Sequence, residues 1–134
     1  MIEEAYVSFE IAKLLKEKGF PQNPCICNTA YTAKGKLSNN VKSFANYSDY
    51  YEIIKPRHYS IAPTQQMAMR WLRENHGIFI AINNDDLDFN WQCFDLINRE
   101  ITLDPKILSE SYAGYKTYEE AVEAAIKHCI ENLI

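Results

Sequence analysis

Two cysteines separated by one residue, Cys25 and Cys27, are the first side chains along the sequence that could do chemistry. On a β-strand, residues two apart point to the same face, so both sulfur atoms could bind one metal ion. A structural zinc site usually needs four Cys or His ligands, often supplied as two closely spaced pairs. Cys93 and Cys129 are isolated, and no Cys/His pair completes the ligand set. The sequence therefore favours buried thiols, and we expect no metal and no other cofactor.

The acidic run Asp85-Asp86-Leu87-Asp88 is a second candidate, because clustered carboxylates can bind calcium. An EF-hand loop needs a central glycine and a glutamate at its twelfth position. Counted from Asn83, the twelfth residue is Phe94, and no glycine lies between them. We therefore expect a solvated turn and no calcium site.

Three histidines, His58, His76 and His128, could act in acid–base or nucleophilic catalysis. His76 suits the end of a helix, where its cationic form is favoured, and His128 falls on the polar side of the last expected helix. His58 alone lies in an irregular region. A nucleophile also needs a base and an orienting group, and no Gly-x-Ser-x-Gly, His-Glu-x-x-His or glycine-rich phosphate motif supplies such a set. A non-enzymatic protein is favoured, and a small enzyme with a site near His58 remains an alternative.

Residues 31–59 differ most from the rest of the chain in composition. This segment has five basic and two acidic residues, hence a net charge of +3, whereas the whole chain carries −4. It also contains five of the nine tyrosines. Basic residues interleaved with aromatic rings can bind single-stranded nucleic acid through phosphates and bases, and Tyr and Arg are also enriched at protein interfaces. Half-buried tyrosines and solvated lysines without any partner would give the same pattern.

The interpretation without a partner is favoured, because +3 is modest beside the basic patches of nucleic-acid-binding proteins. As the lead functional hypothesis we predict that this segment is a partner-binding surface, with a protein as the partner. The first alternative is single-stranded or structured nucleic acid bound by the same segment, 31–59. A homodimer is compatible with the sequence, since symmetric dimers are the commonest oligomers, but no segment locates an interface. The residues expected to carry the contact are Tyr47, Tyr50, Tyr51, Lys55, Arg57 and His58.

Three helices are expected to support this surface. Residues 118–133 follow a capping box, Thr117 to Glu120, and place an apolar residue at every third or fourth position. Residues 9–18 follow Ser8, a good N-cap, and end at Gly19. Residues 63–75 begin with a proline at the first helical position and end before Gly77.

Strands are expected at residues 25–33 and 49–55, with a turn at 34–36 and a polar hairpin arm or loop at 37–48. Residues 78–82 and 89–97 should pair as an antiparallel hairpin across the turn formers at 83–86. Short connections favour an α+β fold, with an antiparallel sheet of about four strands and the helices packed mainly on one face. The length of 134 residues suits a single globular domain, 1–134.

The sequence begins Met1-Ile2-Glu3-Glu4 and shows no signal peptide. No apolar run approaches the ~20 residues needed to span a bilayer, and four cysteines make no dense disulfide framework. These features predict a cytoplasmic protein with reduced thiols and no membrane partner.

Three stretches carry a resemblance to other proteins: Leu14-Leu15-Lys16-Glu17-Lys18-Gly19-Phe20, residues 62–80, and residues 118–134. Together they resemble small uncharacterised proteins encoded by phages, prophages and mobile elements of gut Bacteroides-like bacteria. The resemblance covers about half of the chain and leaves residues 34–57 unmatched. It implies an intracellular accessory protein of a mobile element, and it transfers no catalytic residue because that group has no established activity.

Overall fold

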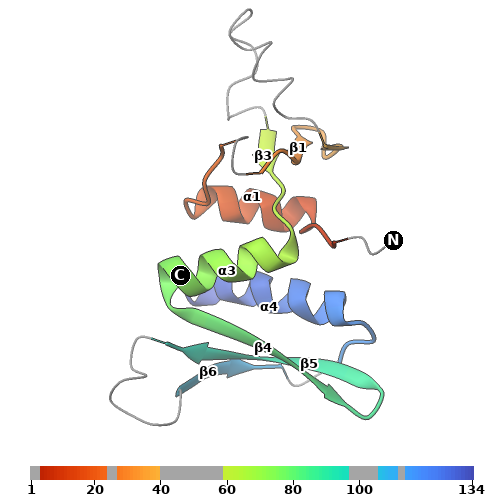
Figure 1. Cartoon of the computed structure of the whole chain (residues 1–134), viewed down its shortest axis with the longest axis vertical. Coiled ribbons are helices and arrows are strands. Elements are labelled where there is room, and N and C mark those ends of the chain that lie inside the picture. Colours follow the sequence, from red (N-terminus) through yellow and green to blue (C-terminus); the bar gives the residue numbers. More distant parts are fainter. Residues whose placement is uncertain (1–3, 24–26, 40–58, 97–105, 112–113) are drawn as a thin grey trace, which may run out of the picture. The chain divides into compact units, whose positions relative to one another are not determined.

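The computed structural model of the chain describes residues 4–23, 27–39, 59–96, 106–111 and 114–134 (Figure 1). Its contacts divide the chain into two compact units: unit 1 is Met1–Ala5 with Gln65–Ile134, and unit 2 is Tyr6–Thr64. The predicted α+β class is confirmed. The described residues form two three-stranded antiparallel sheets, in place of the predicted sheet of about four strands.

The sheet of unit 1 has the order β4-β5-β6, with β4 at Ile78–Asp85, β5 at Asp88–Asp95 and β6 at Lys106–Glu110. The predicted hairpin is confirmed, but its turn is shorter than expected. Pairing continues from Ile78↔Asp95 to Asp85↔Asp88, so only Asp86 and Leu87 form the turn. Asp86 has φ 55°, the left-handed conformation that a two-residue hairpin turn requires. The asparagines at 83 and 84 therefore belong to the strand.

Two helices of unit 1, α3 (Gln65–His76) and α4 (Tyr118–Asn132), cover the same face of this sheet (Figure 1). Thr117 caps α4, since its hydroxyl accepts a hydrogen bond from Glu120 N at 3.1 Å. The apolar stripe of α4 is buried as predicted, and comprises Ala121, Val122, Ala125, Ile126, Cys129 and Ile130.

The helix predicted at 63–75 begins two residues later, at Gln65. Pro63 and Thr64 are held in extended pairing with the start of the chain: Val7 N donates to Pro63 O at 3.0 Å, and Thr64 forms an antiparallel bridge with Tyr6. Backbone groups engaged in this pairing cannot also begin a helix. Proline's suitability for a first helical turn was therefore outweighed by a long-range contact.

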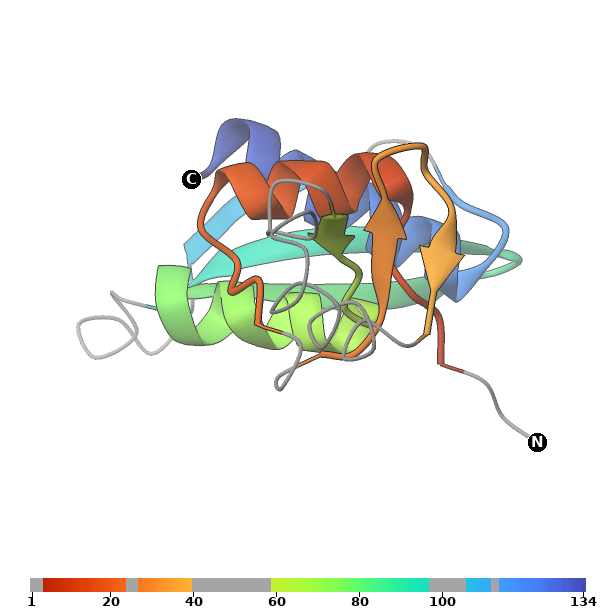
Figure 2. The same cartoon turned by 90° about the horizontal axis from the view of Figure 1, so that it is seen from above.

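Unit 2 contains α1 (Phe9–Glu17) and a sheet of the order β2-β1-β3, with β1 at Ala30–Thr32, β2 at Leu37–Ser38 and β3 at Tyr59–Ile61. Figure 2 shows β1 between the other two strands. The predicted caps of α1 are confirmed: Ser8 Oγ accepts from Ile11 N at 3.3 Å, and Gly19 has φ 96°. Within the described part of the expected strand 25–33, residues 27–33, only the three residues of β1 are in a strand. The expected turn at 34–36 joins β1 to β2.

The predicted strand 49–55 and most of the predicted arm 37–48 lie outside the described residues. Strand β6 was not predicted, because its sequence Lys-Ile-Leu-Ser-Glu is too short and too polar to show a clear alternation. Among the helices that the structure describes, none has the length and apolar character needed to cross a membrane.

Candidate functional site

The six residues predicted to contact a partner all lie outside the described residues: Tyr47, Tyr50, Tyr51, Lys55, Arg57 and His58. The structure does describe both ends of the segment 31–59. Its beginning forms β1, the turn after it and β2, and its end is Tyr59, the first residue of β3. Residues 31–39 and Tyr59 are therefore the part of this segment whose geometry the structure describes.

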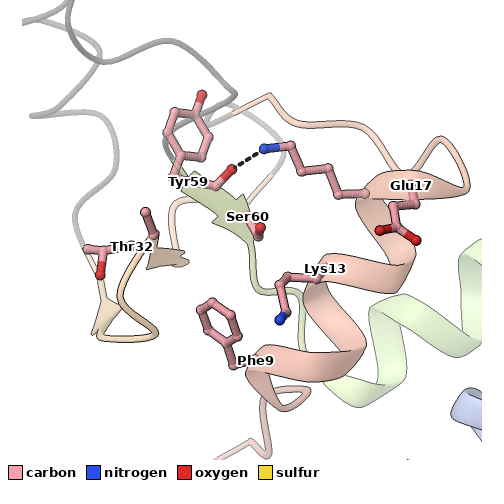
Figure 3. Close-up of a pocket in the computed structure, with 8 residues that line it drawn as sticks. Phe9, Lys13, Glu17, Thr32, Tyr59 and Ser60 are labelled. Carbon is pink, nitrogen blue, oxygen red and sulfur yellow. Dashed lines mark hydrogen bonds between the residues drawn. The ribbon is translucent and has the colours of Figure 1, made fainter.

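A pocket of about 510 Å³ lies in unit 2, beside both ends of that segment (Figure 3). Its volume falls within the range of ligand-binding pockets, roughly 300–1,000 Å³. We call it the α1 pocket; it is lined by Phe9, Lys13, Lys16 and Glu17 of α1, by Thr32 and Ala33 around the end of β1, and by Tyr59 and Ser60 of β3. Three of these residues belong to the segment 31–59.

The helical spacing of residues in α1 determines which of its side chains line the α1 pocket. Phe9, Lys13 and Lys16 follow one another at intervals of four and three residues, so they share one side of α1. A different set, including Ile11 and Leu15, forms the buried stripe. The sheet side depends on strand pairing, since the register Thr32↔Tyr59 brings two residues far apart in sequence to the same edge of the pocket.

Lys16 links the two walls of the pocket. Its Nζ donates a hydrogen bond to the Tyr59 backbone carbonyl at 2.7 Å (Figure 3). Burial lowers the pKa of Lys16 and raises the pKa of the Tyr59 phenol. The Tyr59 hydroxyl in turn donates to the Gln22 carbonyl oxygen at 3.4 Å. Lys16 therefore brings positive charge into the pocket while holding α1 against β3.

Lys13 supplies a second ammonium group. Its Nζ lies 4.5 Å from the centre of the Phe9 ring, close enough for a cation–π interaction. Phe9 is itself held edge-on against Tyr31, with ring centres 5.4 Å apart. Among the described residues, Lys13 makes no ion pair. Its ammonium is therefore available to an anionic group from outside the chain.

The lining of the α1 pocket combines two ammonium groups, one carboxylate (Glu17), hydroxyls and apolar surface. Such a lining suits an anionic group carried on an apolar stem. Within the described ranges, no group of three or more His, Cys, Asp or Glu side chains is placed to hold a metal ion. The chemistry that the pocket supports is recognition by charge and apolar contact.

Gly35 leaves room for the Phe9 ring beside the turn between β1 and β2. Its φ is +86°, and an added Cβ would lie 3.1 Å from Phe9 Cδ2, so alanine would strain the backbone and displace the ring. We expect Gly35→Ala to lower the free energy of unfolding by about 1–3 kcal/mol, the usual cost of a strained left-handed residue. Urea denaturation followed by circular dichroism measures this. Gly19→Ala is the matched control: its φ is +96° with nothing within 4 Å of the added Cβ, so it should show the backbone cost without disturbing the Phe9 amide signals in an NMR spectrum.

A serine–histidine pair in unit 1 was missed by the sequence analysis, because Ser109 lies on the unpredicted strand β6. Ser109 Oγ is 2.8 Å from His128 Nε2, and Asn132 Nδ2 lies 3.4 Å from His128 Nδ1 and 3.2 Å from the His128 carbonyl oxygen. The hydrogen bond between Ser109 and His128 links β6 to α4.

Two other histidines were considered as catalytic candidates, His76 and His58. His76 ends α3, as predicted, and packs edge-on against Trp71 with ring centres 4.7 Å apart. His58 lies outside the described residues. Cys27 is buried, and its thiol donates to the Ala62 carbonyl oxygen at 3.4 Å, whereas Cys25 is not among the described residues.

Comparison of the chain with protein-family models, with curated protein sequences and with solved structures finds no match.

Proposed function

We propose that the protein is a small non-enzymatic binding module and that the α1 pocket receives a segment of a partner protein. The observation that carries this proposal is the position of the pocket. It is lined by residues from both ends of the basic, tyrosine-rich segment 31–59. The resemblance of the sequence to proteins of phages and mobile elements supports an accessory function for such an element as part of this proposal.

Charge points to an acidic partner segment. Lys13 and Lys16 outnumber Glu17 in the pocket, and the segment 31–59 carries +3 in a chain of net charge −4. Complementary charge steers association and selects among partners. The Phe9 ring beside the Lys13 ammonium offers apolar contact next to the charge. An acidic side chain flanked by an apolar one fits both features.

A protein partner is favoured over nucleic acid because the charge of +3 on residues 31–59 is modest beside the basic patches that nucleic-acid binding normally uses. The basic charge and tyrosines of residues 31–59 keep nucleic acid as the second candidate. Titration with labelled single-stranded oligonucleotides at low and moderate salt separates the two. Tight binding that weakens steeply with salt would favour nucleic acid.

Lys13→Glu is expected to reduce partner capture about tenfold, because it reverses the charge that faces the pocket. The full-length protein serves as bait in host-cell extract, and bound proteins are quantified by mass spectrometry. Lys18→Glu makes the same change of charge at the exposed C-cap position of α1, outside the pocket lining, and should leave capture near the wild-type level.

Only a protein that distinguishes these two baits and loses binding with rising salt supports the proposal. Equal capture by both variants, or no protein that discriminates between them, contradicts it. Circular dichroism on each variant checks that unit 2 remains folded.

A further inference from the structure

Two thiols face each other in the interior of unit 1. Cys93 lies on β5 and Cys129 on α4, both side chains are fully buried, and their Sγ atoms are 3.3 Å apart. The two residues are 36 positions apart in the chain. In the sequence both are isolated cysteines, and their spacing alone gives no sign of this contact.

Two regular elements hold the thiols in position. Cys93 and Trp91 are two residues apart on β5, so both point to its buried face. Cys129 belongs to the buried stripe of α4. Ser109, the partner of Cys93 in the β5–β6 register, is hydrogen-bonded to His128, the neighbour of Cys129. The ring of Trp91 packs against His128 with centres 4.9 Å apart. These contacts hold the two sulfur atoms 3.3 Å apart in the packed unit.

We propose that Cys93 and Cys129 are the site of an intramolecular disulfide bond, formed by a two-electron oxidant such as a peroxide or a low-molecular-weight disulfide. With hydrogen peroxide, one thiolate attacks oxygen and breaks the O–O bond, giving a sulfenic acid and water. The second thiol then attacks that sulfur and releases a second water. With glutathione disulfide, two exchange steps release two molecules of glutathione. In both routes two thiols lose two electrons and two protons, and the oxidant gains them.

Burial determines when this reaction can occur. The hydrogen bond with Cys93 and the loss of solvent both raise the pKa of the Cys129 thiol, and the thiolate is the reactive form. The same hydrogen bond lowers the pKa of Cys93. Both side chains are fully buried, so the packed unit keeps an oxidant away from either thiol. Oxidation requires α4 to separate from the sheet, or to be not yet packed on it, as during folding. Once formed, the bond would join β5 to α4 and resist reduction for the same reason.

The geometry favours a disulfide over a metal site. Two thiols are available, and no group of three ligating side chains occurs in the part of the chain that the structure describes. Structural zinc requires four ligands. A bond between the two sulfur atoms needs nothing further from the chain.

Refolding in a redox buffer tests the proposal without the barrier of burial. The wild-type chain is unfolded in urea, refolded in mixed reduced and oxidised glutathione, trapped by alkylation and digested for mass spectrometry. We expect a linked peptide pair containing Cys93 and Cys129, lighter by two hydrogens than the reduced pair. Closing a loop of this length should raise Tm by about 10 °C relative to the sample treated with reductant.

Two cysteine variants test whether the linkage and the shift in Tm both depend on Cys93. Cys27→Ala removes a buried thiol of unit 2 and should keep both the linked peptide and the shift in Tm between oxidised and reduced samples. Cys93→Ala should lose both. Alkylation of Cys93 and Cys129 in refolded, oxidised wild-type protein would overturn the proposal, as would a linkage of either residue to Cys25 or Cys27. The peptide map of the wild type decides the question even if Cys93→Ala fails to fold.

Discussion

A chain that ends at residue 119 is expected to lose cooperative unfolding of unit 1. The truncation removes α4, whose six buried side chains form one wall of the core against β4 and β5. Burying one large apolar side chain contributes about 1.5–3 kcal/mol, whereas a whole domain is stable by only about 5–15 kcal/mol. The remaining sheet and α3 would expose their apolar faces to water. Thermal and urea unfolding followed by circular dichroism, together with gel filtration, measure the result.

The point variant Ile126→Ala tests the same packing without removing the helix. Ile126 is fully buried, and truncating such a side chain costs about 2–5 kcal/mol because a cavity remains. Ile107→Ala is the matched control on β6, where the isoleucine is 50% exposed, and it should cost less than ~1 kcal/mol. Equal losses for the two variants, or a soluble 1–119 fragment that melts cooperatively, would show that α4 is not part of the core.

Leu15→Ala is expected to have the largest effect of any substitution in α1, with a loss of about 2–5 kcal/mol. Leu15 is fully buried in unit 2, together with Ile11 and Ala12 on the same helix and Ile61 on β3. Its backbone carbonyl also accepts the hydrogen bonds that end the helix, from Lys18 N and Phe20 N. Loss of its side chain would loosen the support of Lys13 and Lys16, so binding at the α1 pocket should weaken together with stability.

The neighbouring leucine provides the control. Leu14 is only half-buried, so Leu14→Ala makes the same chemical change with a smaller cavity and should cost about 1 kcal/mol. Hydrogen exchange at the β1 and β3 amides reports the stability of unit 2 separately from that of unit 1. A larger loss for Leu14→Ala than for Leu15→Ala would mean that α1 presents a different face to its core.

The proposed function and the proposed disulfide belong to different units. The α1 pocket lies in unit 2, and the thiol pair lies in unit 1. Variants of one site can therefore be examined with the other site as an internal reference. Lys13→Glu should leave the linked peptide of Cys93 and Cys129 unchanged, and Cys93→Ala should leave the NMR signals of the α1 pocket unchanged.

The sequence by itself determined the features that depend on neighbours within about four residues. Ser8 and Thr117 cap the helices that follow them because each hydroxyl needs only a backbone N–H three residues later. The buried stripe of α4 follows from its helical period. The β4–β5 hairpin was predicted because its two strands are joined by a short turn. In each of these cases the chain meets its partner locally, so the pattern of residues is sufficient.

Only the tertiary structure decided which distant residues meet. Because Thr64 pairs with Tyr6, α3 begins at Gln65 and not at the predicted residue 63. The strands form two sheets, since β1 pairs with β2 and β3, whereas β5 pairs with β4 and β6. The α1 pocket depends on the register between β1 and β3, and the contact of Cys93 with Cys129 depends on how α4 packs against β5. Such contacts form because many apolar surfaces of the chain compete for burial. The spacing of neighbouring residues does not determine which of these surfaces pack together.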